Sequence, residues 1–372
     1  MIAPLQTKPP RREIELDFIR GIAILMVMEY HCFDDSLLAP VFHLLGLTSF
    51  GWIGVDVFFV LSGFLVGGLL VKEWRLSERV DSKRFLIRRG FKIWPQYYVF
   101  LILMLLSGHR ALRELWGNLL NIQNYTGGVA HTWSLAVEEH AYLILVFCLV
   151  IAAWMKVRMR SLFFFFVMFA AAVSLLRLYL SKLGLPTFSP THTRMDGILE
   201  GVLLAMLYHY VPETFRRLQN QRWLWILSLG AVLVFLRLHL DGWVARSVQY
   251  DFANLMGVAL LMLLYRHNEG KQRNFAYRFV AWLGVYSYGI YLWHVSVSAP
   301  VRLVGKHLPH ALDRVWEGVA PLVLGALVGI LFTKLVEFPT LKVRDRLFPR
   351  RVDSAVGVPA EVEFEEQAQH PV

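Results

Sequence analysis

Two ionisable residues lie inside the first apolar segment of the chain, IELDFIRGIAILMVMEYH. Arg20 and His31 are eleven residues apart, so about three helical turns and about 16 Å separate them along one face of a helix. If that helix enters a membrane near Leu16, His31 lies past the middle of an apolar core about 30 Å thick. A histidine there can serve as a base between reactants that arrive from opposite sides. Its position alone is equally compatible with a hydrogen-bonded packing histidine.

Acidic residues also occur within apolar segments. Asp56 lies among aromatic residues in FGWIGVDVFFVLSGFLVGG, and a carboxylate in such a segment requires a cationic or histidine partner. Glu138 and Glu139 lie near the start of HTWSLAVEEHAYLI, where the helix dipole offers an ordinary structural explanation. Similar polar clusters are Arg194 with Asp196 and Glu200, and Ser287 with His294. Ionisable residues within a membrane predict a functional site by default.

A basic and aromatic segment, RFLIRRGFKIWPQYY, follows the second apolar run. Its basic residues at helical spacing are Arg84, Arg88, Arg89 and Lys92. Arginine forks bind phosphate bidentately, and an aromatic ring can stack on a nucleotide base. The segment therefore predicts a phosphate-binding cradle. An ordinary basic loop beside a membrane is the competing interpretation.

The composition indicates what kind of element positions these residues. Of the 372 residues, 56% are hydrophobic and 18% are charged, whereas soluble domains contain roughly 45–50% apolar and about 25% charged residues. The apolar residues form repeated runs of about 17–25 residues, which suits membrane spans. The net charge is +10. The basic residues that produce it lie between the apolar runs, and no nucleic-acid-binding motif accompanies them, so we expect no nucleic-acid partner. Cys32 and Cys148 lie within apolar runs and predict neither a disulfide nor a metal site.

We predict an all-α, polytopic transmembrane bundle of about ten helices. These lie near residues 16–36, 50–71, 93–107, 132–155, 161–180, 194–211, 223–240, 251–265, 280–299 and 317–336. Alternate connections hold 26 and 7 Lys and Arg residues, so the positive-inside rule predicts that both termini are cytoplasmic. The predicted parts are a cytoplasmic arm at 1–15, a transmembrane domain at 16–340 and a cytoplasmic tail at 341–372. The tail composition predicts disorder after about residue 351.

With these residues assembled, the chain resembles the acyltransferase-3 family of integral membrane proteins. That family O-acylates bacterial surface polysaccharides, peptidoglycan, root-nodulation signals and some antibiotics. The similarity covers nearly the whole chain in family order, through LDFIRGIAILMVMEYH, GVDVFFVLSGFL, RRGFKIWP, WSLAVEEHAYL, RMDGILEG, YSYGIYLWH and VEFP. Each motif is modest alone, but their shared order makes the resemblance specific.

The resemblance implies essential roles for Arg20 and His31, with His31 as the catalytic base. It also implies a cytoplasmic pair of arginines three residues apart, which corresponds here to Arg89 and Lys92. The lysine is a departure, because it replaces a planar fork with a point charge. Ala141 is a second departure, since an aromatic residue usually precedes the residue at Tyr142.

On this basis we expect an acyl-CoA donor, most simply acetyl-CoA, to bind from the cytoplasm without a permanently bound cofactor. Its phosphates are expected on Arg84, Arg88, Arg89 and Lys92. His31, oriented by Asp56 or Glu138, would then accept the proton of an attacking hydroxyl. Direct transfer and an acyl-histidine intermediate are both compatible with the sequence. The expected acceptor is a glycan, a lipid-linked saccharide or a small glycoside at the bacterial cytoplasmic membrane.

Two other classes of protein compete with the enzyme. A transporter or flippase would use the buried ionisable residues as a proton or substrate path. That class predicts inverted repeats and interrupted helices, which the sequence does not display, and it leaves the ordered basic and aromatic segment unexplained. A membrane assembly protein is the third possibility, although several polar clusters inside helices are a costly way to build a scaffold.

Overall fold

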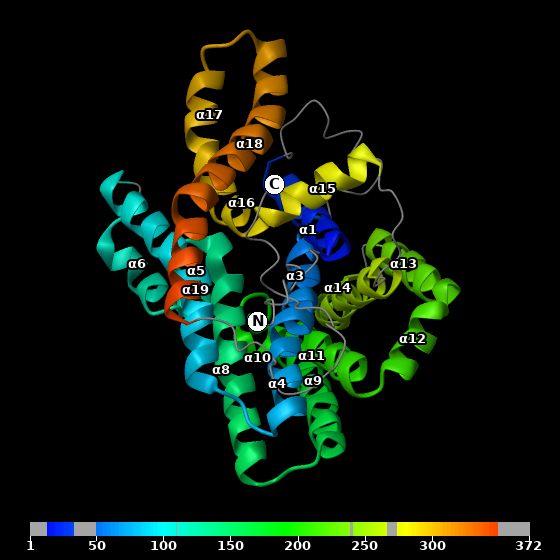
Figure 1. Ribbon diagram of the computed structural model, residues 1–372. Coiled ribbons are helices and arrows are strands. Elements are labelled where there is room, and N and C mark those ends of the chain that lie inside the picture. Colours follow the sequence, from blue (N-terminus) through cyan, green and yellow to red (C-terminus); the bar gives the residue numbers. More distant parts are fainter. Residues whose placement is uncertain (1–12, 33–49, 109, 239–240, 266–273, 349–372) are drawn as a thin grey trace.

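A computed structural model describes residues 13–32, 50–108, 110–238, 241–265 and 274–348 of the chain. The secondary structure of these residues is helical, and they contain no strand (Figure 1). The predicted all-α class is therefore confirmed for the described part. Most of the predicted N-terminal arm, the end of the first predicted helix at 33–36 and the tail beyond 348 lie outside the described residues.

The helices follow one another along the chain, and the single helix predicted at 280–299 is divided into several shorter ones. They are α1 (Ile14–Cys32), α3 (Ile53–Ser62), α4 (Gly68–Ser77), α5 (Ser82–Leu106), α6 (Leu112–Leu119), α7 (Gln123–Thr126), α8 (Trp133–Trp154), α9 (Met159–Lys182), α10 (Thr191–Arg194), α11 (Asp196–Tyr210), α12 (Pro212–Asn220), α13 (Arg222–Arg237), α14 (Trp243–Leu264), α15 (Phe275–Val285), α16 (Ser287–Trp293), α17 (Ser298–Gly305), α18 (His310–Phe332) and α19 (Phe338–Leu347). Single π-helical turns at Gly63–Gly67 and Thr333–Glu337 join α3 to α4 and α18 to α19.

Five helical segments in the described part of the chain are long and apolar enough to cross a membrane. They are Ile53–Ser77, Ala130–Trp154, Met159–Lys182, Trp243–Leu264 and Val315–Leu347. Each overlaps a predicted helix, because a long apolar run is visible without any tertiary information. The total of ten spans and the side on which the termini lie stay predictions.

The largest difference from the predicted boundaries concerns α5. This helix begins at Ser82 rather than near residue 93, and the Asp81 side chain caps it by accepting a hydrogen bond from the Arg84 amide at 3.1 Å. The basic segment predicted as a loop therefore forms the first turns of a helix. Apolar runs mark where a helix is buried in lipid, but Lys and Arg are good helix formers that continue a helix beyond that limit.

Glycines allow several helices to approach one another closely. A Cβ atom at Gly63 would lie 1.9 Å from the carbonyl oxygen of Ile198 in α11, and one at Gly201 would lie 2.1 Å from that of Val60. The glycine-rich stretch after α3 is thus a helix contact, as its small-residue spacing predicts. A second close contact joins α1 to α15, where a Cβ at Gly284 would lie 1.8 Å from the Asp17 carbonyl oxygen.

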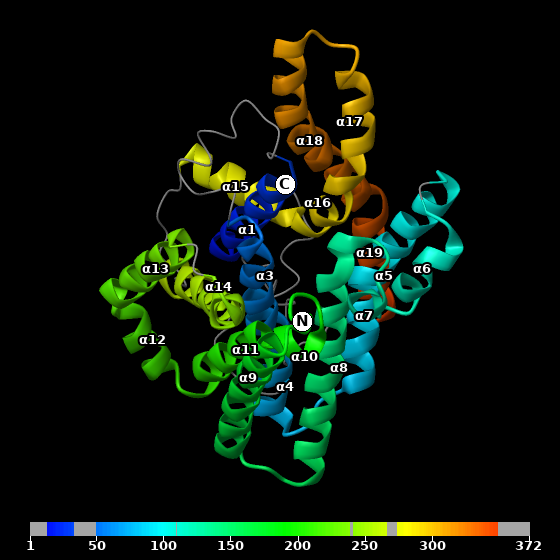
Figure 2. The same ribbon diagram turned by 180° about the vertical axis from the view of Figure 1, so that it is seen from behind.

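The connections occupy opposite ends of the molecule. In both views, the α4–α5 and α8–α9 connections lie at one end, and the turn between α17 and α18 lies at the other (Figures 1 and 2). The 72–92 and 156–160 connections belong to the set rich in Lys and Arg that is predicted on one side, and the 302–314 region belongs to the sparsely charged set predicted on the other. The fold is consistent with that division, which leaves the middle of the bundle for the polar residues of the helices.

Candidate active site

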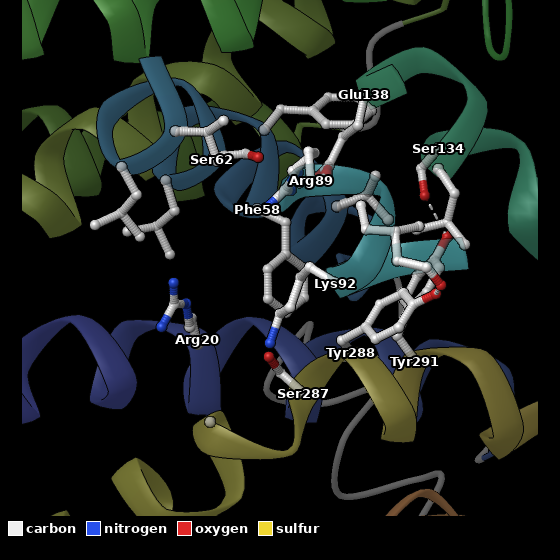
Figure 3. Close-up of a pocket in the computed structure, with 18 of the residues that line it drawn as sticks. Arg20, Phe58, Ser62, Arg89, Lys92, Ser134, Glu138, Ser287, Tyr288 and Tyr291 are labelled. Atoms are coloured by element: carbon white, nitrogen blue, oxygen red, sulfur yellow. Dashed lines mark hydrogen bonds and ion pairs between the residues drawn. The ribbon is translucent and has the colours of Figure 1, made fainter. Parts of the chain in front are cut away.

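A cavity of about 120 Å³ lies among α1, α3, α5, α8 and the α15–α16 region. Its ionisable lining residues are Arg20, Arg89, Lys92 and Glu138, and its hydroxyl-bearing ones are Ser62, Ser134, Ser287, Tyr288 and Tyr291. The remaining lining is mostly apolar and comes largely from α3. Figure 3 shows Arg20 extending into this space from α1, across from the side chains of α3 and α5. Four predicted site residues from three different helices therefore meet at one cavity.

Arg89 and Glu138 form a polar network at one wall of the cavity. The Arg89 Nη2 atom lies 3.5 Å from the Glu138 carboxylate and donates a 2.7 Å hydrogen bond to the Tyr142 hydroxyl. That hydroxyl donates to Glu138 at 3.0 Å and is also hydrogen-bonded to Ser62. The Arg89 guanidinium lies 4.6 Å from the centre of the Tyr142 ring. Because several groups fix its plane, Arg89 is held in one orientation toward the cavity.

The other two cavity cations also have carboxylate partners. Arg20 pairs with Asp17, one helical turn earlier, at 3.2 Å, and Lys92 forms an ion pair with Glu337. Neither carboxylate is among the lining residues, so the lining itself contains three cations and one carboxylate. A pocket with this excess of positive charge and partly apolar walls favours an anionic ligand that also carries apolar groups.

The structure separates the four basic residues of the predicted cradle. Arg89 and Lys92 line the cavity, whereas Arg84 and Arg88 do not. Arg88 instead donates to the Asp345 carboxylate at 3.2 Å and to the Phe348 carbonyl oxygen near the end of α19. Helix geometry explains the division, since Arg88 projects about 100° away from Arg89 around the same helix.

His31 belongs to a group of histidines next to the cavity rather than to its lining. Its Nδ1 atom lies 2.9 Å from the Val27 carbonyl oxygen and 3.3 Å from Nε2 of His294. The ring of His131 lies 5.5 Å from that of His294. Tyr291 connects the two regions, because it lines the cavity and its hydroxyl donates to the His131 carbonyl oxygen.

Comparison with known proteins identifies the family to which this chain belongs. A family profile described as an acyltransferase domain, of the acyltransferase-3 type, matches residues 13–336. The chain belongs to this acyltransferase family. The match includes every helix that contributes to the cavity, so the resemblance inferred from the seven motifs is confirmed.

Two relatives of the chain bear O-acetyltransferase names. A peptidoglycan O-acetyltransferase of Listeria monocytogenes is 24% identical over 88% of this chain and 55% of its own length. A Bacillus subtilis protein, provisionally named a peptidoglycan O-acetyltransferase, is 25% identical over 91% of this chain and 56% of its own length. The chain therefore spans about half the length of the curated relatives it matches. No solved structure matches the chain significantly.

The acyltransferase fold gives the two predicted carboxylates different surroundings. Glu138 lies in the cavity wall beside Arg89, whereas Asp56 forms a 2.6 Å ion pair with Arg194 in which both side chains are 1% exposed. His31 contacts His294, while orientation by Asp56 or Glu138 stays a prediction. Asp56 therefore has a structural partner, and its proposed catalytic role needs a direct test.

Sequence reasoning missed two contributors to this site. Tyr142 links Arg89 to Glu138 and Ser62, and His131 joins the histidine group. One signal was present for each: Tyr142 lies one helical turn after Glu138, and His131 opens the HTWSLAVEEHAYLI segment that also holds Glu138. The described residues contain no cluster of three or more His, Cys, Asp or Glu suited to a metal ion.

Proposed function

We propose that this protein is a membrane O-acetyltransferase that moves an acetyl group from cytoplasmic acetyl-CoA to a hydroxyl of a glycan. The observation that carries this proposal is the convergence of Arg20, Arg89, Lys92 and Glu138 on one cavity in a chain of the acyltransferase family. Acetyl-CoA is an anion with a long, largely uncharged pantetheine arm. Its charge suits the three lining cations, and its arm suits the partly apolar walls.

The donor is proposed to place its phosphates on Arg89 and Lys92, with Arg84 and Arg88 contributing nearer the cytoplasm. Arg20, on the same helix as His31, also lines the cavity and adds a third cation near these phosphates. The pantetheine arm is proposed to run from these basic residues through the cavity toward the histidine group, so that the thioester approaches His31.

The proposed transfer uses His31 as the general base. Its Nε2 atom accepts the proton of the acceptor hydroxyl as the oxygen attacks the thioester carbonyl carbon. The C–S bond then breaks, and the imidazolium returns the proton to the departing thiolate of coenzyme A. In the alternative, His31 Nε2 attacks the thioester first and the C–S bond breaks to release the thiolate of coenzyme A. The acceptor hydroxyl then attacks the acetyl-histidine, the N–acetyl bond breaks, and the hydroxyl proton passes to the thiolate.

The acceptor is proposed to be a glycan on the outer side of the membrane. Two relatives bear names that refer to peptidoglycan, which makes peptidoglycan-type saccharides the first acceptors to try. Lipid-linked saccharides and small glycosides follow, because their hydroxyl groups offer the same nucleophile to the same base. The acceptor is proposed to meet the thioester at His31, past the middle of the bilayer.

The decisive experiment uses the full-length protein, purified and reconstituted in lipid, with acetyl-CoA labelled in its acetyl group. We expect label to appear in an added saccharide only when protein, donor and acceptor are all present. Coenzyme A should be released in equal amount. Movement of intact acetyl-CoA into the vesicle lumen without acetylated product would instead support a transporter.

A further inference from the structure

We propose that His294 is a positioning residue that sets the tautomer of His31 and stabilises its protonated form. This inference rests on the proposed function, in which His31 is the base. His294 follows α16 and lies 263 residues from His31 in the chain. The fold brings the two imidazoles to a centroid distance of 5.0 Å with an interplanar angle of 64°.

The contacts of His294 determine which of its nitrogens carries the proton. Its side chain is fully buried, and its Nδ1 atom lies 2.7 Å from the Tyr291 carbonyl oxygen and 3.2 Å from that of Ile290. Carbonyl oxygens only accept hydrogen bonds, so Nδ1 must be the protonated nitrogen. In the neutral ring, Nε2 is then left as an acceptor, and this is the atom that faces His31.

The same reasoning carries over to His31. Its Nδ1 atom faces two acceptors, the Val27 carbonyl oxygen at 2.9 Å and Nε2 of His294 at 3.3 Å. His31 satisfies both only with a proton on Nδ1. The lone pair of the neutral His31 ring therefore resides on Nε2, which is the nitrogen that can take a proton from a hydroxyl.

The local packing keeps His294 in place. The residue opens a 3₁₀ turn at His294–Val297, and α18 crosses it at Gly325. A Cβ atom at Gly325 would lie 3.0 Å from the His294 Cα and 3.1 Å from its Cβ, which is tighter than ordinary packing. Glycine thus lets α18 pack directly against the backbone of His294 and limits its movement.

This arrangement gives His294 a definite part in the transfer. When His31 takes the hydroxyl proton on Nε2, its Nδ1–H remains bonded to the Nε2 lone pair of His294. A hydrogen bond from an ionised donor is stronger than one from a neutral donor, so it stabilises the imidazolium more than the resting ring. His294 itself neither gains nor loses a proton.

The test compares two replacements of His294 with a buried histidine elsewhere. His294→Leu keeps the bulk but removes the acceptor, and we expect kcat to fall about 10- to 150-fold, as for loss of a charged hydrogen bond. The donor KM should stay within about twofold, because the phosphate-binding residues are unchanged. His294→Gln, whose amide oxygen can accept near the Nε2 position, should recover most of kcat. The control His209→Leu, in α11, should leave kcat near wild type.

A second measurement does not depend on catalysis. The ¹⁵N spectrum of histidine-labelled protein in lipid, assigned by difference with His31→Gln, reports which His31 nitrogen is protonated. We expect Nδ1 protonation in the wild type and a shift toward Nε2 protonation in His294→Leu. An Nε2-protonated His31 in the wild type would overturn the inference, as would His294→Leu with more than half of wild-type kcat or His294→Gln as impaired as His294→Leu.

These results also separate the inference from the proposed function. If the wild type shows the expected tautomer but transfers no acetyl group to any acceptor, the histidine pair stands and the enzymatic proposal fails. If His31→Ala abolishes transfer but His294→Leu does not impair it, the enzymatic proposal stands and the role of His294 is rejected.

Discussion

Arginine side chains within the helices occupy two regions that differ in how much of their charge stays accessible. Around α9, α11 and α14, Arg177 pairs with Asp196 at 2.6 Å and with Asp251 at 2.5 Å. Nearby, Arg194 pairs with Asp56 at 2.6 Å. The two arginine side chains are 0% and 1% exposed. Their charges are compensated within the protein, as burial in a low-dielectric interior requires.

The cavity region pairs its cations as well but leaves their side chains more exposed. The side chains of Arg20, Arg89 and Lys92 are 21%, 11% and 22% exposed, and all three line open space although each has a carboxylate partner. A cation that is paired yet faces a cavity can share its charge with a ligand, whereas an enclosed ion pair cannot. The comparison teaches that ionisable residues inside membrane helices serve the fold in one region and ligand binding in the other.

The largest effect should come from the base next to the cavity. We expect His31→Ala to reduce the rate of acetyl transfer by about 10²–10⁴, because a positioned general base contributes that much. The variant should remain folded and inserted, which thermal unfolding in detergent can verify. Retention of more than a tenth of wild-type turnover would remove His31 from the mechanism.

Breaking the buried ion pair between Arg194 and Asp56 should lower the stability of the protein rather than the rate of acetyl transfer. We expect Arg194→Leu to lower the free energy of unfolding by about 3–5 kcal/mol, because it leaves the buried Asp56 carboxylate uncompensated. The double variant Asp56→Leu with Arg194→Leu should recover much of that loss, since no charge is then left unpaired. Unfolding curves of the purified variants measure both effects.

The same pair of variants decides the role of Asp56. If Arg194→Leu unfolds at the wild-type temperature yet no longer transfers acetyl groups, the pair belongs to the chemistry. That outcome would support the catalytic role predicted for Asp56 from the sequence. It would contradict the conclusion that the buried ion pairs around α9, α11 and α14 serve only the fold.

A smaller, specific effect is expected at the cavity wall. Arg89→Ala should raise the donor KM about 10- to 150-fold, equivalent to a charge-assisted hydrogen bond of roughly 1.5–3 kcal/mol. The acceptor KM should stay unchanged, and added salt should mimic part of the loss in the wild type. Arg79→Ala, an exposed arginine between α4 and α5, is the matched control and should be neutral. An unchanged donor KM in Arg89→Ala would leave the basic segment as a topology signal only.

The smallest effect is expected from Lys92→Arg. This change restores the planar guanidinium group implied by the family resemblance, so the donor KM should stay unchanged or fall by a few fold. Titration of the donor KM measures it. A large loss would mean that the ion pair of Lys92 with Glu337 requires the compact ammonium group, and that Lys92 serves the fold.

Local patterns explain which parts could be predicted from sequence. The apolar runs located the five candidate spans, and the spacing of Arg20 and His31 placed both on α1, because each depends on one segment alone. The start of α5 could not be found from hydropathy, since charged residues there continue the helix. Helical spacing grouped Arg88 with Arg89, but only packing against α19 shows that they face different neighbours.

Contacts between distant segments could not be predicted from the sequence. His31 meets His294, and Asp56 meets Arg194, across 263 and 138 residues of chain. Each of these residues was noticed as an ionisable group in an apolar run, but the partner was not identifiable. A single sequence marks buried polar residues, while tertiary packing chooses how they pair.

The most direct test of donor binding at the cavity is the equilibrium affinity for coenzyme A of two double variants in lipid. The cavity pair is Arg89→Ala with Lys92→Ala, and the comparison pair, on the same helix, is Arg84→Ala with Arg88→Ala. We expect the cavity pair to weaken binding at least about tenfold more, since a charge-assisted hydrogen bond contributes roughly 1.5–3 kcal/mol. Equal losses in both variants, or a larger loss in the comparison pair, would contradict donor binding in the cavity.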